Sequence, residues 1–392
     1  MKRLGWILAL LFVLMAPSAW ADKKITVQQL QEMLHSLQQA NKTDVEVANE
    51  LKLIELTEEL TRNTMDNLAS SIPGPLSTQQ LYVLEERSAV LTPPAADLPS
   101  LPAPDATAQK ALLDKAIDYA VKTYAQLPHL TATKTTIRFQ DNLKPPDRAD
   151  PGKVPDTVWK DARMANGSQF IYYIGSTDAK VESQNGVEMV SKGKDPTRWG
   201  ANGEIVQVGT GPVLSSIVQE AQAAGKFTWL RWETVNGLQT AVFSFAVEKK
   251  KSHYTVNYCC FPDTDQTGTT DNRGNGGIAS TGRGNMQMVT SWSPHKETPP
   301  YHGEIFVDSG TGIILRLVVL AEFKPSGVIH QEDTRIDYGA MKVGDKPLVL
   351  PVRTIIDTEV TPNGEDTAIG FSNRRTLFTI DYKNYQLDGT AH

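Results

Sequence analysis

The segment Asp308-Ser309-Gly310-Thr311 is the part of the sequence that most resembles a catalytic motif. Aspartic proteases place such a segment after apolar residues, so that two copies bring two carboxylates together to share one proton. A second Asp-Ser/Thr-Gly does not occur, although Ala368-Ile369-Gly370 matches the apolar-apolar-Gly that single-lobed members carry downstream. Asp and Gly also form ordinary hairpin turns between strands. A turn is therefore the favoured interpretation, and an aspartic hydrolase that uses Asp308 is the less favoured one.

Metal and cofactor motifs fail at specific positions. Asp263-x-Asp265 resembles the start of a calcium loop, but Gly274 occupies the twelfth position, where a bidentate Glu is needed. The seven histidines form no His-x-x-x-His pair, the Gly-rich run 274–284 does not join a strand to a helix, and there is no Gly-x-Ser-x-Gly elbow. Apart from loose calcium binding by the acids of 263–271, the sequence predicts no catalytic residue, no metal ligand and no cofactor.

Cys259 and Cys260 are the only cysteines, and they are adjacent. Neighbouring side chains on a strand point to opposite faces, so the two thiols are badly placed to bridge each other. We expect one to face the core as a small apolar residue and the other to be open to oxidation or intermolecular pairing. A strained redox pair is the alternative, without a Cys-x-x-Cys motif to support it.

The first 21 residues predict export. Lys2 and Arg3 precede an apolar run from Leu4 to Met15, and a short stretch then ends in an Ala-x-Ala site at Ala21. The apolar run is shorter than the roughly 20 residues that a membrane span needs. We expect cleavage after Ala21 and a periplasmic or secreted protein with no later transmembrane span; an uncleaved anchor is the alternative.

The charge of the mature chain argues against nucleic acid as a partner. Without the first 21 residues, 37 basic and 45 acidic side chains leave a net charge of −8. Such a chain lacks the positive surface that phosphate backbones and anionic lipids attract. The one dense basic run, Lys249-Lys250-Lys251, falls where a hairpin turn is expected.

The N-terminal third divides into three parts. Residues 22–91 predict helices, because Thr26 with Gln29 and Thr43 with Glu46 form capping boxes before apolar residues at helical spacing. Residues 92–106 carry five prolines, which predicts a stiff, extended linker. A further helix is expected near 107–126.

From Thr131 onward, short β-branched and aromatic runs alternate with turn residues, which predicts strands. Asn185-Gly186, Asn236-Gly237 and Asn363-Gly364 are two-residue hairpin turns, so neighbouring strands should pair antiparallel. One helix near 213–224 interrupts the series, and the long Gly- and Thr-rich segment 262–285 is expected to be a flexible loop. The predicted class is α+β, with an antiparallel β domain over 107–392.

The stretch from Tyr301 to Val360 resembles the LolA/LolB-like lipoprotein-carrier superfamily, which includes RseB. The matching residues are Val307-Asp308 before the Thr311-Gly312 turn, the returning Arg316-Leu317 strand, and Gly344 before Leu350-Pro351. The whole chain also resembles exported bacterial proteins. The resemblance implies a large curved antiparallel sheet, a half-barrel with one or two packed helices, whose concave apolar face holds acyl chains or a partner peptide.

These observations predict a non-enzymatic binding or carrier protein for a lipid-like ligand or an envelope protein. About half of the candidate aromatic liners can face one cavity, because successive strand residues alternate. The candidates are Phe170, Tyr172, Trp229, Trp232, Phe243 and Phe245. The alternative is an envelope interaction or assembly protein that recruits its partner through the N-terminal helices.

Overall fold

The computed structural model describes most of the chain after the predicted signal. The described residues are 23–140, 171–189, 206–207, 212–225, 227–262, 278–280, 286–288, 292–324, 327, 329–360 and 374–388. The predicted signal peptide, Phe170, the Asn363-Gly364 turn and most of segment 262–285 lie outside them. Within the described residues, no helix has both the length and the apolar character needed to cross a membrane.

The N-terminal region is a small helical module with its own core. Capping boxes start α1 (Val27–Gln39) at Thr26 and α2 (Asp44–Leu51) at Thr43, as the sequence pattern predicts. The module also contains two short parallel strands that the sequence analysis missed, β1 (Lys23–Ile25) and β2 (Ile54–Leu56). Its other helices are α3 (Arg62–Leu68), the 3-10 turn η1 (Ala69–Ser71) and α4 (Pro75–Ser88). Its buried apolar residues include Leu30, Leu34, Leu51, Ile54, Leu60 and Leu81.

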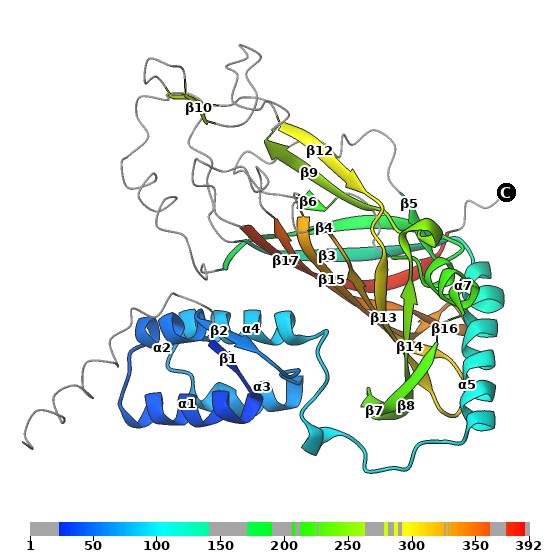
Figure 1. Cartoon of the computed structure of the whole chain (residues 1–392), viewed down its shortest axis with the longest axis horizontal. Helices are drawn as coiled ribbons and strands as arrows, with labels where there is room; N and C mark the ends of the chain where they lie inside the picture. Colours follow the sequence, from blue (N-terminus) through cyan, green and yellow to red (C-terminus); the bar gives the residue numbers. More distant parts are fainter. Residues whose placement is uncertain are drawn as a thin grey trace, which may run out of the picture.

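Ten strands form one open antiparallel sheet, with β5 and β7 at its edges. In spatial order they are β5 (Val187–Met189), β4 (Tyr172–Gln184), β3 (Leu130–Gln140), β17 (Arg374–Leu387), β16 (Lys346–Val360), β15 (Ile329–Val343), β14 (Ile314–Ala321), β13 (Tyr301–Asp308), β8 (Leu238–Val247) and β7 (Thr228–Val235). The predicted turns at Asn185-Gly186 and Asn236-Gly237 join β4 to β5 and β7 to β8, and all four residues have positive φ. The α+β class with a curved antiparallel sheet is therefore confirmed (Figure 1).

Two smaller sheets extend from the large one. The first contains β6 (Val206–Gln207), β9 (Val256–Pro262) and β12 (Trp292–Glu297), and the second pairs β10 (Ile278–Ser280) with β11 (Met286–Met288). Cys259 and Cys260 both fall in β9, as expected, but their side chains lie outside the described set. The run Lys249-Lys250-Lys251 forms the 3-10 turn η5 between β8 and β9.

Helices cover the two faces of the large sheet from opposite sides (Figure 1). One face, here called the inner face, packs against α5 (Ala106–Asp118), the π-turn η3 (Tyr119–Thr123), the 3-10 turn η4 (Tyr124–Gln126) and α7 (Leu214–Ala224). The other, the outer face, packs against the helical module through α4 and the residues after it. The linker between them includes the 3-10 turn η2 (Ala95–Asp97).

Candidate functional site

The inner face is apolar because alternate residues of adjacent strands point to the same side. On β8 these are Ala241, Phe243, Phe245 and Val247, and on β13 they include Tyr301, Ile305 and Val307. Gly303 lies between them, where a Cβ would stand 2.9 Å from the Phe245 ring and closer still to the backbone of β14. Small residues on the helices, Ala116, Ala120 and Ala221, let the helix backbones approach this surface closely.

Four of the predicted liners lie on the inner face, where Trp229, Trp232 and Phe243 form one aromatic group and Phe245 contacts Phe227 and Tyr301. Phe243 and Phe245 are each 2% exposed, and Trp229 and Trp232 are partly buried beside them. The Trp229 ring meets Trp232 edge-on at 4.9 Å and Phe243 at 5.6 Å between centroids. Tyr172 begins β4, but its side chain, like Phe170, is not among the described ones. The role of these residues as ligand liners stays a prediction.

A β-bulge puts both tryptophans on the same face. Residues three apart on a regular strand face opposite sides, but the register of β7 shifts between Trp229 and Arg231. The skipped residue, Leu230, is 43% exposed, and Trp232 lies beside Trp229. The Trp232 Nε1 donates a hydrogen bond to the Pro102 carbonyl at 2.8 Å, which fastens the proline-rich linker to this edge of the sheet.

Helix α5 covers the inner face with a small buried surface. Asp105 caps it by accepting from the Ala108 N–H at 2.8 Å, yet Ala116 is the one residue of α5 that is fully buried. Leu112, Leu113 and Ile117 are only partly buried. The helix then continues into the π-turn η3, a distortion that is frequent at functional sites. A helix that buries so little apolar area has little free energy holding it in place.

The turn around Asp308 supports α5. The Asp308 carboxylate accepts from the N–H groups of Gly310 (3.3 Å) and Thr311 (3.1 Å), so it holds the hairpin turn together. Gly312 has φ +80°, and a Cβ there would stand 2.5 Å from the Cβ of Lys115 on α5. The motif therefore forms a hairpin turn whose Gly312 leaves room for α5. This arrangement gives no support to the interpretation as an aspartic hydrolase.

A cavity of about 60 Å³ lies between the inner face and the segments that cover it at Tyr124, Leu127, Pro212 and Val213. Its walls combine apolar side chains with tyrosines and one carboxylate. They are Tyr124, Leu127, Ala132, Val181, Ser183, Gly186, Glu188, Pro212, Val213, Ile336, Tyr338, Leu350, Pro351, Thr354, Tyr382 and Tyr385. Since one ordered water needs roughly 15 Å³ of such space, the cavity accommodates a few waters.

The polar groups of this cavity are few and fixed. Glu188 accepts from Lys134 Nζ at 2.8 Å and from the Tyr382 hydroxyl at 3.1 Å. Burial raises the pKa of Tyr124, Tyr338 and Tyr382, so these hydroxyls stay protonated at neutral pH. Among the described wall residues there is no histidine, cysteine or second carboxylate that could act as a general base or nucleophile. The described walls thus combine apolar contact with one polar end.

The outer face is different in kind: it is lined by ion pairs that the helical module covers. Arg335 lies between Glu59 of the module (2.6 Å) and Asp337 of its own strand (3.0 Å). Arg316 also pairs with Asp337 at 2.6 Å. The side chains of Arg335, Arg316, Glu59 and Asp337 are only about a tenth exposed.

Further pairs join α4 to the outer face. Arg353 contacts Glu86, and Arg375 pairs with Asp357 at 3.0 Å beside Arg87. Cavities of about 190 Å³ and 120 Å³ remain between module and sheet, both lined by these charged residues. The charged contact between the module and the sheet thus leaves space for water. An apolar contact packed at the usual density of a protein interior would fill that space.

The pKa values on the outer face separate into two groups. Burial raises the pKa of Asp337, but Arg335 and Arg316 outweigh it and lower that pKa to about 2. Burial, together with the neighbouring Glu86, raises the pKa of Glu85 to about 7. Burial and the nearby Asp357 likewise raise the pKa of Asp333 to about 7. The network thus contains carboxyls that are charged throughout and others that titrate near neutrality.

No family model matches the sequence, and no curated protein matches it significantly. Among solved structures, the chain is similar to an outer membrane lipoprotein-sorting protein domain from Vibrio parahaemolyticus. The match covers 73% of this chain and 95% of that domain, with 10% sequence identity and a TM-score of 0.27. A likeness at this level assigns no function.

The sequence patterns predicted neither the tyrosine cavity nor the ionic outer face. Tyr338, Tyr382 and Tyr385 lie on β15 and β17, which are neighbours of β16 and meet only through the sheet order. The outer face did leave a signal, since Asp333, Arg335 and Asp337 alternate along β15. Charged residues at alternate positions ordinarily indicate a strand face in contact with water. The alternation therefore does not predict that the helical module covers this face.

Proposed function

We propose that this chain is an exported, non-enzymatic binding protein that holds a lipid-like ligand against the inner face of its sheet. The main support for the proposal is the cavity of about 60 Å³ on an open apolar sheet face, where Tyr124 of η4 forms part of the wall. The turn η4 continues from α5 through η3, and Ala116 is the one fully buried residue of α5. An acyl chain is too large for that cavity, so ligand entry requires the continuous segment α5–η3–η4 to move outward. This segment is tied at one end by the Trp232 bond to the Pro102 carbonyl and at the other by the Asn185 N–H bond to the Leu127 carbonyl.

The polar end of the cavity supports a ligand with a polar head. Burying a methylene group contributes about 0.8 kcal/mol, so the chain of such a ligand provides most of the affinity. Lys134 and Glu188, held together at 2.8 Å, lie beside the tyrosine hydroxyls and offer both a cation and a carboxylate. These groups orient the head while the apolar walls hold the tail.

The test begins with the full chain, exported and purified without detergent. Lipid extraction and mass spectrometry should find a co-purified amphiphile, and a fluorescent fatty-acid probe should bind to the delipidated protein. Val181→Trp fills the cavity and should weaken probe binding at least tenfold. Val187→Trp is the matched control, because Val187 is 38% exposed on β5 and lies outside the cavity wall. A protein that carries no lipid and does not bind the probe contradicts the proposal, as does equal binding by both variants.

A second function, recruitment of an envelope protein by the helical module, rests on one exposed apolar site. Asp44 of α2 accepts from the N–H groups of Leu76 (3.0 Å) and Ser77 (2.8 Å) at the start of α4, which brings the two helix ends together. Val45 and Leu76, at these ends, are 56% and 49% exposed. Crosslinking in cells should capture a partner protein with the wild type. The Leu76→Asp variant should no longer capture it, whereas the control Gln28→Asp on α1 should capture it as the wild type does.

A further inference from the structure

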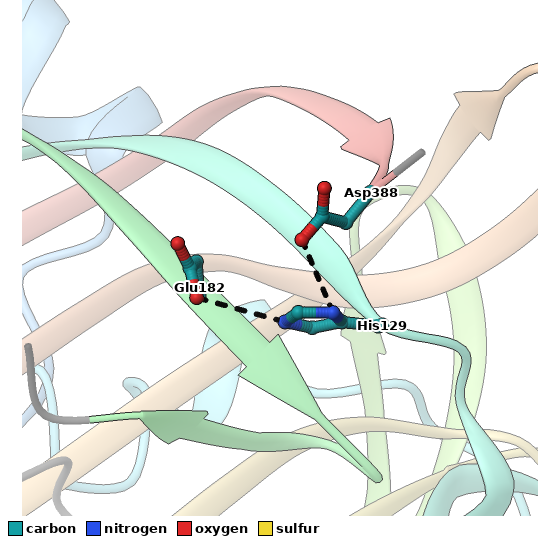
Figure 2. Close-up of side chains that lie close together, drawn as sticks. All are labelled: His129, Glu182 and Asp388. Carbon is teal, nitrogen blue, oxygen red and sulfur yellow. Dashed lines mark ion pairs between the residues drawn. The ribbon is translucent and has the colours of Figure 1, made fainter. Parts of the chain in front are cut away.

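His129, Glu182 and Asp388 meet at one end of the sheet, although they are far apart in the sequence (Figure 2). The strand register brings them together. Thr131 of β3 pairs with Glu182 of β4 on one side and with Gln386 of β17 on the other. The Asp388 N–H donates to the His129 carbonyl at 3.1 Å, which extends the ladder by one more bond. The cluster is thus built on three adjacent strands of the sheet.

The imidazole lies between the two carboxylates. Its Nδ1 is 3.2 Å from the Asp388 Oδ2, and its Nε2 is 3.8 Å from the Glu182 Oε2. One donor atom from each residue lies within 4.8 Å of the other two. A tetrahedral zinc ion bound at about 2.0–2.2 Å places its ligand atoms roughly 3.3–3.6 Å apart. A movement of about 1 Å by the carboxylates closes the cluster to that size, and Glu182, which is 56% exposed, has room to make it.

The surroundings of the ring leave one donor atom unsatisfied. The His129 Nε2 atom is buried, has no hydrogen-bond partner among the described residues, and lies beyond hydrogen-bond distance of the Glu182 carboxylate. A cation held between the ring and the two carboxylates would satisfy these groups together.

We propose that His129, Glu182 and Asp388 form a binding site for a divalent transition-metal ion, with Zn²⁺ as the preferred ion. Imidazole nitrogen favours Zn²⁺ over Mg²⁺ and Ca²⁺, which prefer oxygen donors throughout. Water completes the coordination on the exposed side of Glu182. The ion joins the end of β17 to β3 and β4, beside the Asn185-Gly186 turn whose Asn185 N–H bonds to the Leu127 carbonyl. This site is separate from the inner-face cavity, and its test does not depend on lipid binding.

The experiment is calorimetric titration of the metal-free full chain with Zn²⁺ in a buffer that does not coordinate metals. One equivalent should bind, and binding should be lost in His129→Asn and weakened at least tenfold in Glu182→Gln and in Asp388→Asn. The matched control is His302→Asn, because His302 pairs with Glu322 at 2.8 Å on the surface and the described residues offer no third donor there. It should bind as the wild type does.

Unfolding midpoints measured without metal separate loss of the site from loss of the fold. A variant that unfolds like the wild type without metal, yet gains no stability from Zn²⁺, supports the site, since a ligand stabilises the state that it binds. The proposal is overturned if the wild type binds no stoichiometric Zn²⁺ or if His129→Asn binds it equally well. Loss of binding in His302→Asn would place the site elsewhere and overturn it too.

Discussion

The two faces of the ten-stranded sheet are both covered by helices, yet different forces hold the covers. On the inner face, apolar side chains meet α5 and α7, and the contact of α5 is small. On the outer face, buried arginines and carboxylates fix the helical module in one orientation. Apolar contact is tolerant of geometry, whereas buried ion pairs are stable only when each partner is in place. We therefore expect α5 to move relative to the sheet more easily than the helical module does.

The largest effect is expected from Arg335→Ala on the outer face. The substitution leaves Glu59 and Asp337 buried without their main cation, which should lower the free energy of unfolding by about 3–5 kcal/mol. Denaturant unfolding measures it. Lys110→Ala removes an exposed pair with Asp114 on α5 and should change stability by less than about 0.5 kcal/mol. If Arg335→Ala and Lys110→Ala both have small effects on stability, ion pairs do not hold the helical module on the outer face.

A second effect, on the order of 1–3 kcal/mol, is expected from pH. The pKa values of Glu85 and Asp333 are raised to about 7 in the folded protein, so the folded state binds more protons than the unfolded state between pH 4 and 7. The two carboxyls therefore make their full stabilising contribution below pH 4, and that contribution is lost as the pH rises through 7. Asp337, with a lowered pKa, contributes oppositely and only below pH 4.

Unfolding at pH 5.5 and pH 8 measures this dependence. Glu85→Gln should flatten the fall in stability between the two, because the amide does not titrate. Glu50→Gln, at an exposed position of α2, should leave the fall unchanged. A stability that rises steadily to pH 8 would contradict the assignment of these two carboxyls.

A third effect, about 1–2 kcal/mol, is expected from Gly312→Ala on the inner face. Its φ of +80° disfavours alanine, and the new Cβ meets Lys115 of α5. The variant should expose α5 to limited proteolysis while the sheet stays folded. Gly310→Ala in the same turn has only ordinary contacts, at 3.8 Å and 3.9 Å from Asp308, and should be cleaved like the wild type.

Local sequence signals predict much of the fold, but they predict little of the candidate sites. Capping boxes at Thr26 and Thr43 and Asn-Gly turns at 185 and 236 act within a few residues, so the pattern predicts them directly. The bulge that puts Trp229 and Trp232 on one face breaks the alternation that predicts the rest of the strand. The His129 cluster depends on the register of three strands, which spacing along the chain does not contain.

Native-state hydrogen exchange of α5 and α4 compares the mobility of the two covers within one protein. Local opening exposes amides at a lower free energy than global unfolding does. We expect α5 amides to exchange by such local openings, while α4 amides exchange only when the sheet unfolds. Protection of α5 equal to that of the central strands β14 and β15 would contradict it.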